Sequence, residues 1–334
     1  MTNINANKSM IKTLIWPLVS ILIVIGFIPQ QSLASTELPE IGNNSSRLVS
    51  IKQERILGKA WLRALLRQAN TYDEHIVNAY LSDLVYSLAP SSSVIDKDFS
   101  FVILDSKVLN AFAVPGSVIG VNAGLFIHAV TEQEFASVIG HELAHVSQRH
   151  YARRLEEQQK STPLQFVGLL ASVLIAATAG SDAGFAALAS SQALSIEKQL
   201  KYSRQNEEEA DRIGIATVYD AGYDPRAMPV MFERMFRQAR IQGNQPPEYL
   251  STHPLSEKRI ADTRNRAVQY PRRNYADNIE YHISQSLIIN HYADSNGAAQ
   301  KYFKSVIENG NSVQIYGAQF GLAVAMLSSN PKES

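Results

Sequence analysis

The chain has 334 residues, of which 45% are hydrophobic and 19% are charged, as is typical of a globular protein. Its 31 basic and 31 acidic side chains give a formal net charge of zero, so we expect no nucleic-acid partner. The chain has no cysteine, which excludes disulfides, thiolate metal ligands and a cysteine nucleophile, so a bound metal would need His, Asp or Glu.

Residues 1–34 are predicted to be a secretory signal peptide. Two lysines precede a mostly apolar run over residues 13–28, and the small residues around Ala34 fit a cleavage site. An uncleaved membrane anchor is the alternative, but the run is shorter than the ~20 apolar residues of a spanning helix. No cysteine follows it, so it is not a lipoprotein signal. We predict an exported protein with a flexible segment at residues 35–48.

The next part of the chain predicts helices followed by a small sheet. Apolar residues recur at helical spacing between residues 51 and 88, and Pro90 closes this helical region. Residues 99–105 predict a strand. Residues 109–122 predict a second extended stretch, with a turn or kink at Pro115-Gly116-Ser117.

A helix is expected from residue 132 to about residue 156, because Thr131 and Glu134 can form a capping box at its start. It contains the sequence His141-Glu-Leu-Ala-His145, which fits the His-Glu-x-x-His pattern. Histidines four positions apart project from one face of a helix. They can therefore supply two of the ligands of a tetrahedral zinc ion.

Glu142 stands beside the first histidine and could act as the general base that takes a proton from the attacking water. The alternative is a helix that carries two exposed histidines and a carboxylate without a function. The position of the motif within a helix, downstream of two predicted strands, favours a zinc protease.

Residues 163–194 predict a helical hairpin, because an apolar stretch over residues 163–179 is broken by glycines before an alanine-rich segment. Two interpretations stay open. The hairpin could be buried in the core, or it could touch a membrane or cover the site, since its first arm is apolar nearly all round.

A long helix is predicted from Ser195 to Asp220, ending near Gly222, and it contains an acidic run. Glu207 and Asp211 share one face of this helix. Glu207 could be a third zinc ligand, and Asp211 could bond the free nitrogen of a ligand histidine. A solvated acidic run is the alternative.

Further helices are predicted at residues 226–241 and 255–267, with a proline-bearing loop between them. His253 lies in this loop, where a histidine is more often a surface residue than a ligand. After Pro271 the chain is predicted to be helical to its end.

The motif around His141 and the segment Ser203–Gly214 together resemble the HtpX-like zinc metalloprotease family, peptidase family forty-eight. They are most similar to its periplasmic BepA-type branch, over about residues 45–275. The resemblance implies an α+β, mainly helical, zincin-like fold with a small sheet beside the active-site helix. It implies one Zn²⁺ per chain, with Glu207 as the third protein ligand and Asp211 bonded to a ligand histidine.

The same resemblance assigns roles around the site. An edge strand is expected to align the substrate by backbone pairing. His253 is implied to be a removable fourth ligand that holds the enzyme at rest. Arg204 and His253 are both candidates for stabilising the charge that develops on the scissile carbonyl oxygen. The residues of the expected edge strand are Asn110, Ala111, Phe112 and Ala113.

The predicted domains are a metalloprotease domain at residues 49–275 and a partial tetratricopeptide-like segment at residues 276–334. Ala299, Phe303 and Gly321 fit the 34-residue repeat, but only about one and a half units precede Ser334. This segment is either a degenerate repeat tail or a set of helices that packs on the protease domain.

We therefore predict a zinc endopeptidase of the periplasm that degrades misfolded outer-membrane proteins. Its expected partners are unfolded or misassembled proteins and the outer-membrane protein assembly machinery. One alternative is a chaperone or assembly factor that acts by binding, with proteolysis repressed. Another is a protein with a purely structural zinc site, which Glu142 argues against because a closed site needs no base.

Overall fold

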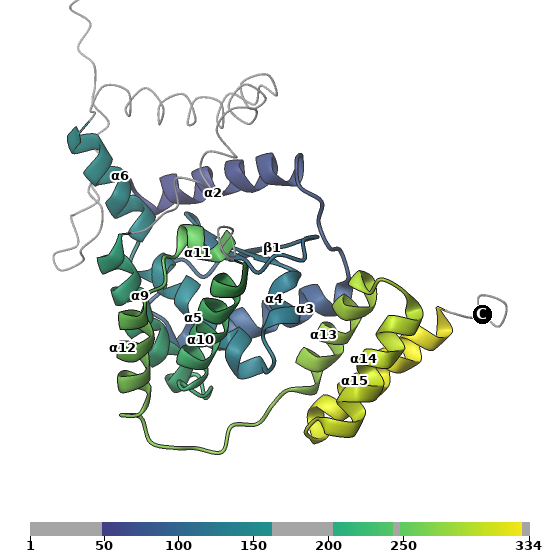
Figure 1. Ribbon diagram of the computed structural model, residues 1–334. Coiled ribbons are helices and arrows are strands. Elements are labelled where there is room, and N and C mark those ends of the chain that lie inside the picture. Colours follow the sequence, from purple (N-terminus) through teal and green to yellow (C-terminus); the bar gives the residue numbers. More distant parts are fainter. Residues whose placement is uncertain (1–48, 162–202, 243–247, 329–334) are drawn as a thin grey trace, which may run out of the picture. The chain divides into compact units, whose positions relative to one another are not determined.

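Figure 1 shows the computed structural model, which describes residues 49–161, 203–242 and 248–328. The predicted signal peptide, the flexible segment at residues 35–48 and the hairpin at residues 163–194 lie outside these ranges. None of the helices within them is long and apolar enough to cross a membrane.

The first predicted helical region forms two helices, α2 (Ile51–Leu66) and α3 (His75–Leu88), and a 3-10 turn, η1 (Ala89–Ser91), follows α3. Ser50 begins α2 with a capping box, because its hydroxyl accepts from the Gln53 N–H while the Gln53 side chain accepts from the Ser50 N–H. The apolar face of α3 is buried in the main core.

The two predicted extended stretches form one three-stranded sheet in the order β1-β3-β2, because the second stretch folds into two strands. β3 pairs in parallel with β1 and antiparallel with β2. A tight turn joins β2 to β3, with positive φ at Gly116 (76°) and Ser117 (58°). A Cβ at Gly116 would lie 2.6 Å from the Arg55 Cα, so α2 can approach this turn only because a glycine is there. The strands are β1 (Ser100–Leu104), β2 (Ala111–Val114) and β3 (Val118–Asn122).

β2 lies at the edge of this sheet and separates two apolar clusters. Ala111 and Ala113 pack in the core with α5 (Glu132–Ser147), while Phe112 and Val114 pack with Trp61 of α2. β2 therefore runs beside the helix that carries His141 and His145.

Helix α5 lies at the centre of the fold (Figure 1), and most of its side chains are buried. It follows the short helix α4 (Gly124–His128) and packs against α9 (Arg204–Asp220) and α10 (Ala227–Gln242). A Cβ at Gly214 would lie 3.1 Å from the His141 backbone, and one at Gly140 would lie 2.5 Å from Val218 Cγ1. These two glycines let α5 and α9 approach closely.

The predicted capping box of α5 forms only in part. The Thr131 hydroxyl accepts from the Glu134 N–H, as expected. The Glu134 carboxylate instead accepts from the Val130 N–H and from Arg234, because the approach of α10 supplies a charged donor.

The prediction of one helix as far as residue 156 was wrong. α5 ends at Ser147 and α6 (His150–Ser161) begins three residues later, because Arg149 adopts a left-handed conformation with φ +50°. The Arg149 guanidinium donates to the Glu54 carboxylate at 3.2 Å and to the Val49 carbonyl. These partners lie about a hundred residues earlier, so helical periodicity could not reveal them.

The prediction that the long acidic helix starts at Ser195 was also wrong. Ser203 has extended backbone and caps α9 by accepting from the Asn206 N–H. The end of α9 at Asp220, followed by Gly222 with φ +92°, was predicted correctly.

Two predicted helices are confirmed almost to the residue, as α10 and α12 (Glu257–Ala267). The short helix α11 (Glu248–Thr252) was missed, because five residues show no periodicity. Residues 271–278 are not helical, contrary to prediction, and the chain becomes helical again at α13 (Ile279–Tyr292).

The C-terminal helices pack on the rest of the described chain. α13 contacts α3 and α4, and the buried Tyr281 hydroxyl donates to the Ala129 carbonyl at 2.7 Å. The last two helices are α14 (Asn296–Asn309) and α15 (Ser312–Leu327), and α15 packs against both α13 and α14. The Phe303 ring lies directly over Gly321, where a Cβ would be 2.4 Å from it. The mainly helical α+β fold with a small sheet beside α5 is thus confirmed.

Candidate functional site

Four buried side chains from three parts of the chain converge on one point. His141 and His145 come from α5, Glu207 comes from α9, and His253 follows α11. Each offers one possible ligand atom, and these atoms all lie within 4.8 Å of one another. The two α5 histidines face each other with their Nε2 atoms 3.0 Å apart.

The other distances show how the cluster closes. Glu207 Oε2 lies 3.5 Å from His141 Nε2, and Glu207 Oε1 lies 3.5 Å from His145 Nε2. His253 directs Nδ1 toward the centre, 3.1 Å from Glu207 Oε1 and 3.4 Å from His141 Nε2. Three imidazoles and one carboxylate therefore point at the same volume.

This donor set fits a metal ion. Two imidazole nitrogens 3.0 Å apart can share at most one proton, and nitrogen with carboxylate oxygen is a donor set that divalent transition metals prefer. Both carboxylate oxygens of Glu142 are buried and accept no hydrogen bond from the described residues. A buried carboxylate without a donor is costly, so a cation nearby would satisfy this group.

Local structure explains why the cluster forms. One helical turn places His145 under His141. The glycine contact at Gly214 brings α9 close enough for Glu207 to reach them. Tyr249, one turn before His253, stacks on its ring with centroids 4.5 Å apart.

Asp211 lies beside His141, with its Oδ1 3.0 Å from His141 Nδ1. Arg259 of α12 donates two hydrogen bonds to the Asp211 carboxylate, both at 2.7 Å. Its Nη1 lies 2.9 Å from Glu207 Oε2 and donates to the Pro254 carbonyl at 2.8 Å. Sequence reasoning missed Arg259, although it lies on the buried face of α12 with Ile260.

The charges of the site shift several pKa values. Burial lowers the pKa of His141, but the carboxylates of Asp211 and Glu207 outweigh burial and raise it to about 9. Burial raises the pKa of Glu207, but the neighbouring histidines outweigh it and hold this pKa well below its usual range. Glu207 is therefore ionised in the folded protein.

A second group that sequence reasoning missed lies behind His145. His145 Nδ1 is 2.8 Å from Nδ1 of the fully buried His150, and His150 Nε2 is 3.1 Å from Glu209 Oε2. Arg153 donates to the same Glu209 oxygen at 2.9 Å. The spacing in the sequence gave no signal for this contact, because the break after α5 creates it.

The remaining predicted residues lie around the cluster in different ways. Arg204 is exposed on the first turn of α9, whereas the four clustered side chains are buried. Asn110 is buried immediately before β2, and the other three residues of the expected substrate strand belong to β2 itself.

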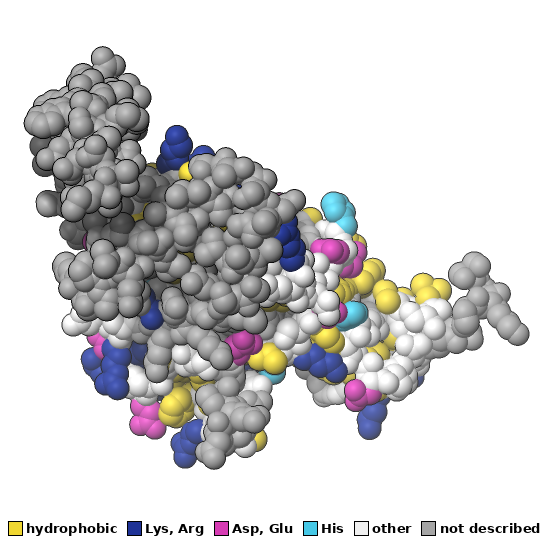
Figure 2. Space-filling model, turned by 90° about the horizontal axis from the view of Figure 1, so that it is seen from above, with side chains coloured by type: hydrophobic (Ala, Val, Ile, Leu, Met, Phe, Trp, Pro, Cys, Tyr) yellow, Lys and Arg dark blue, Asp and Glu magenta, His cyan; other side chains and the backbone are white. Residues whose placement is uncertain are grey.

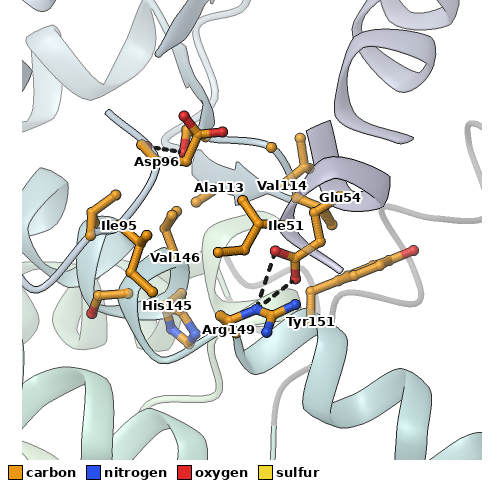
Figure 3. A pocket seen from close by; sticks show the side chains of 15 residues that line it. Ile51, Glu54, Ile95, Asp96, Ala113, Val114, His145, Val146, Arg149 and Tyr151 are labelled. Atoms are coloured by element: carbon orange, nitrogen blue, oxygen red, sulfur yellow. Dashed lines mark hydrogen bonds and ion pairs between the residues drawn. The ribbon is translucent and has the colours of Figure 1, made fainter. Parts of the chain in front are cut away.

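A pocket lies beside the cluster and reaches the end of β2 (Figure 3). Its walls come from the start of α2, the end of β2 with the following turn, and the end of α5. His145 and the Glu54–Arg149 ion pair both line it. Most of its other lining residues are apolar: Ile51, Val94, Ile95, Ala113, Val114, Pro115 and Val146.

The model of peptidase family M48 matches residues 75–267. A Vibrio cholerae protein named "Putative beta-barrel assembly-enhancing protease" is 41% identical over 271 residues, which are 80% of this chain and 56% of that protein. The beta-barrel assembly-enhancing protease of Escherichia coli is 33% identical over 319 residues, which are 96% of this chain and 65% of that protein.

A more distant relative is the mitochondrial metalloendopeptidase OMA1 of Arabidopsis thaliana, 28% identical over 208 residues, which are 62% of this chain and 36% of that protein. The chain therefore spans only about half to two thirds of the length of the first relatives it matches. The family match covers α3 through α12, and thus all four side chains of the candidate metal-binding cluster. The chain belongs to peptidase family M48.

Proposed function

We propose that this chain is a zinc-dependent endopeptidase, with His141, His145 and Glu207 binding one zinc ion and Glu142 acting as general base. The observation that supports it most is the buried convergence of these three ligand side chains. Glu142 follows His141 directly in the sequence, and its buried carboxylate accepts no hydrogen bond from the described residues. A bound zinc ion would supply Lewis acidity toward the scissile carbonyl and lower the pKa of the attacking water to roughly 7.

The residues of the chain would do the rest. Glu142 would take the proton of the attacking water and pass it to the leaving amine. Arg259 and Asp211 would hold Glu207 and His141 in place through their charge-assisted bonds. The buried site would exclude bulk water from these groups.

The substrate is proposed to be an unfolded protein segment. An extended chain could add a strand at the edge of β2, along residues 110–113, with one side chain entering the pocket beside His145. The apolar lining of that pocket suits an apolar side chain, of the kind that folded proteins bury and misfolded ones expose.

We further propose that the protein acts in the periplasm on misfolded outer-membrane proteins. The names of the relatives, which speak of beta-barrel assembly, support this role. A leader at residues 1–34 would export the chain, and without a cysteine it would not be a lipoprotein. The division into a protease domain at residues 49–275 and a repeat-like segment at residues 276–334, with partners in the outer-membrane assembly machinery, stays part of this proposal.

The central test is the substitution Glu142→Gln in the zinc-loaded protein. Removing the base should lower the rate of peptide cleavage by about a hundredfold or more, while the zinc content stays near one ion per chain. Glu208→Gln is a matched control, because Glu208 lies on α9 at the surface and pairs only with Lys258 among the described residues. An unchanged rate in the Glu142 variant contradicts the proposal.

A second candidate function is an assembly factor that acts by binding, with proteolysis repressed. The observation that favours it is His253, whose Nδ1 lies among the other ligand atoms and whose Nε2 is 3.6 Å from Glu142 Oε1. A fourth protein ligand would fill the position that water needs in a catalytic zinc site.

His253→Ala should therefore accelerate cleavage of an unfolded substrate, in proportion to the fraction of molecules that His253 keeps closed. The rate of His253→Ala is compared with that of the parent and of the double variant with Glu142→Gln. If His253→Ala is no faster than the parent, the brake does not exist. The double variant lacks the proposed base and should not cleave. If it still supports outer-membrane assembly as well as the parent does, the binding role is favoured.

A further inference from the structure

We propose that His150 and Glu209 are positioning residues that fix the tautomer and the orientation of His145 for metal binding. This inference rests on the proposed zinc site. It concerns groups on the side of His145 that faces away from the cluster.

The first step is the chain of contacts. His145 Nε2 faces His141 and Glu207, and its Nδ1 lies 2.8 Å from His150 Nδ1. His150 continues the chain through Nε2, which lies 3.1 Å from Glu209 Oε2. The rings of His145 and His150 meet edge to face, with centroids 4.8 Å apart.

The second step is the placement of protons. A neutral imidazole that binds a metal through Nε2 carries its hydrogen on Nδ1. That hydrogen points at His150 Nδ1, which must then accept and carry its own hydrogen on Nε2. The Nε2–H of His150 can donate to the Glu209 carboxylate, which cannot donate in return. The carboxylate therefore sets the direction of both hydrogen bonds.

The third step is the backbone that brings His150 to His145. Residues five positions apart on a continuous helix point about 140° away from each other, so an uninterrupted α5 would separate the two rings. The break at Arg149, with φ +50°, returns His150 to the same side. The Glu54 carboxylate holds Arg149 in this conformation. The strained backbone at Arg149 thus places His150 against the proposed metal ligand His145.

The fourth step is the comparison of the two α5 histidines. His141 has a direct carboxylate partner in Asp211, which Arg259 holds. His145 has an indirect one in Glu209, which Arg153 holds, with His150 inserted between them. Each histidine is thus linked to a carboxylate that is paired with an arginine, directly for His141 and through His150 for His145. Both carboxylates belong to α9.

The test separates positioning from simple space filling. In His150→Asn the amide oxygen can occupy the place of Nδ1 and still accept from His145, whereas the contact with Glu209 is lost. In His150→Gln the amide reaches the place of Nε2 and keeps the contact with Glu209, but no acceptor faces His145. Zn²⁺ affinity is measured by competition with a chromophoric chelator, and the unfolding temperature of the metal-free protein is measured in parallel.

We expect His150→Gln to bind Zn²⁺ about 10–100-fold more weakly than the parent, and His150→Asn to bind more tightly than His150→Gln. Glu209→Ala should also weaken binding, whereas the neighbouring surface variant Glu208→Ala should not. Equal affinity of His150→Gln and the parent, or the reverse order of the two His150 variants, overturns the inference while the proposed protease stands. A parent protein that binds no Zn²⁺ overturns both.

Discussion

Arg259 is a single residue that holds two carboxylates of the site, those of Asp211 and Glu207. Its guanidinium is buried between Asp211 and Glu207, and it also donates to the carbonyl that follows His253. Burial lowers the pKa of Arg259, but the two carboxylates outweigh burial and raise it, so Arg259 stays charged. One side chain thus connects α12, α9 and the segment after α11.

Arg259→Met should therefore destabilise the metal-free protein strongly. The substitution leaves two buried carboxylates without their cation, which costs about 3–5 kcal/mol of unfolding free energy. Urea unfolding of the parent and the variant measures the difference. Lys258→Met is the control, since this exposed neighbour pairs with Glu208 at the surface and should change stability by less than about 1 kcal/mol. Equal losses in the two variants would show that Arg259 does not have this role.

At the residue scale the sequence revealed the part of the cluster that is local. The spacing within one helix pointed to His141, Glu142 and His145, and the acidic run pointed to Glu207. Arg259 and His150 could not be found in this way, because their partners become neighbours only when α12 and α6 pack. The resemblance, rather than any spacing, pointed to His253.

At the scale of elements, the contact between α5 and α9 positions Glu207. It depends on Gly214, whose missing side chain leaves room for the His141 backbone. A glycine in the middle of a helix costs up to about 1 kcal/mol relative to alanine. The close approach of the two helices must therefore offset this cost.

Gly214→Ala should be destabilising, although alanine favours helices. Its Cβ would lie 3.1 Å from His141 N and Cα, so α9 would have to shift. We expect a loss of about 1–3 kcal/mol and weaker Zn²⁺ binding, because Glu207 moves with α9. The matched control is Gly297→Ala on α14, where the nearest atom to a Cβ is 3.9 Å away. A stable Gly214 variant with unchanged Zn²⁺ affinity would contradict this account.

The elements themselves were predicted well where one face is apolar over several turns, as in α3, α5 and α10. The predicted helix ends were wrong where contacts with residues distant in the sequence determine them. The side chain of Arg149 ends α5 through Glu54, and no local signal in residues 145–156 reports this contact. The helix α11 is too short for periodicity to show.

At the scale of the whole molecule, the segment before α13 meets α3 and the start of α5 around Glu132. This carboxylate accepts from the Tyr80 hydroxyl of α3 at 3.1 Å, and its backbone N–H donates to Asp277, just before α13. On the face shown in Figure 2, basic and acidic side chains are interspersed among the described residues, in keeping with the net charge of zero.

Stability should depend on pH through Glu132. Burial raises its pKa to about 7, and Asp277 adds to this although the Tyr80 hydrogen bond opposes it. The folded protein therefore binds a proton that the unfolded chain, with a pKa near 4.5, has released. The free energy of unfolding should fall as pH rises from about 4.5 to 7. Glu132→Gln should flatten this dependence in urea titrations of the metal-free protein, and an unchanged slope would contradict it.

One backbone contact links the proposed brake to the proposed substrate strand. The Tyr249 N–H donates to the Leu109 carbonyl at 3.4 Å, so α11 contacts the chain immediately before β2. A peptide that pairs along residues 110–113 would meet α11 at this point and compete with it. The substrate would then displace the brake as it binds, and its apparent affinity would be lowered by the factor that the closed molecules impose on the population.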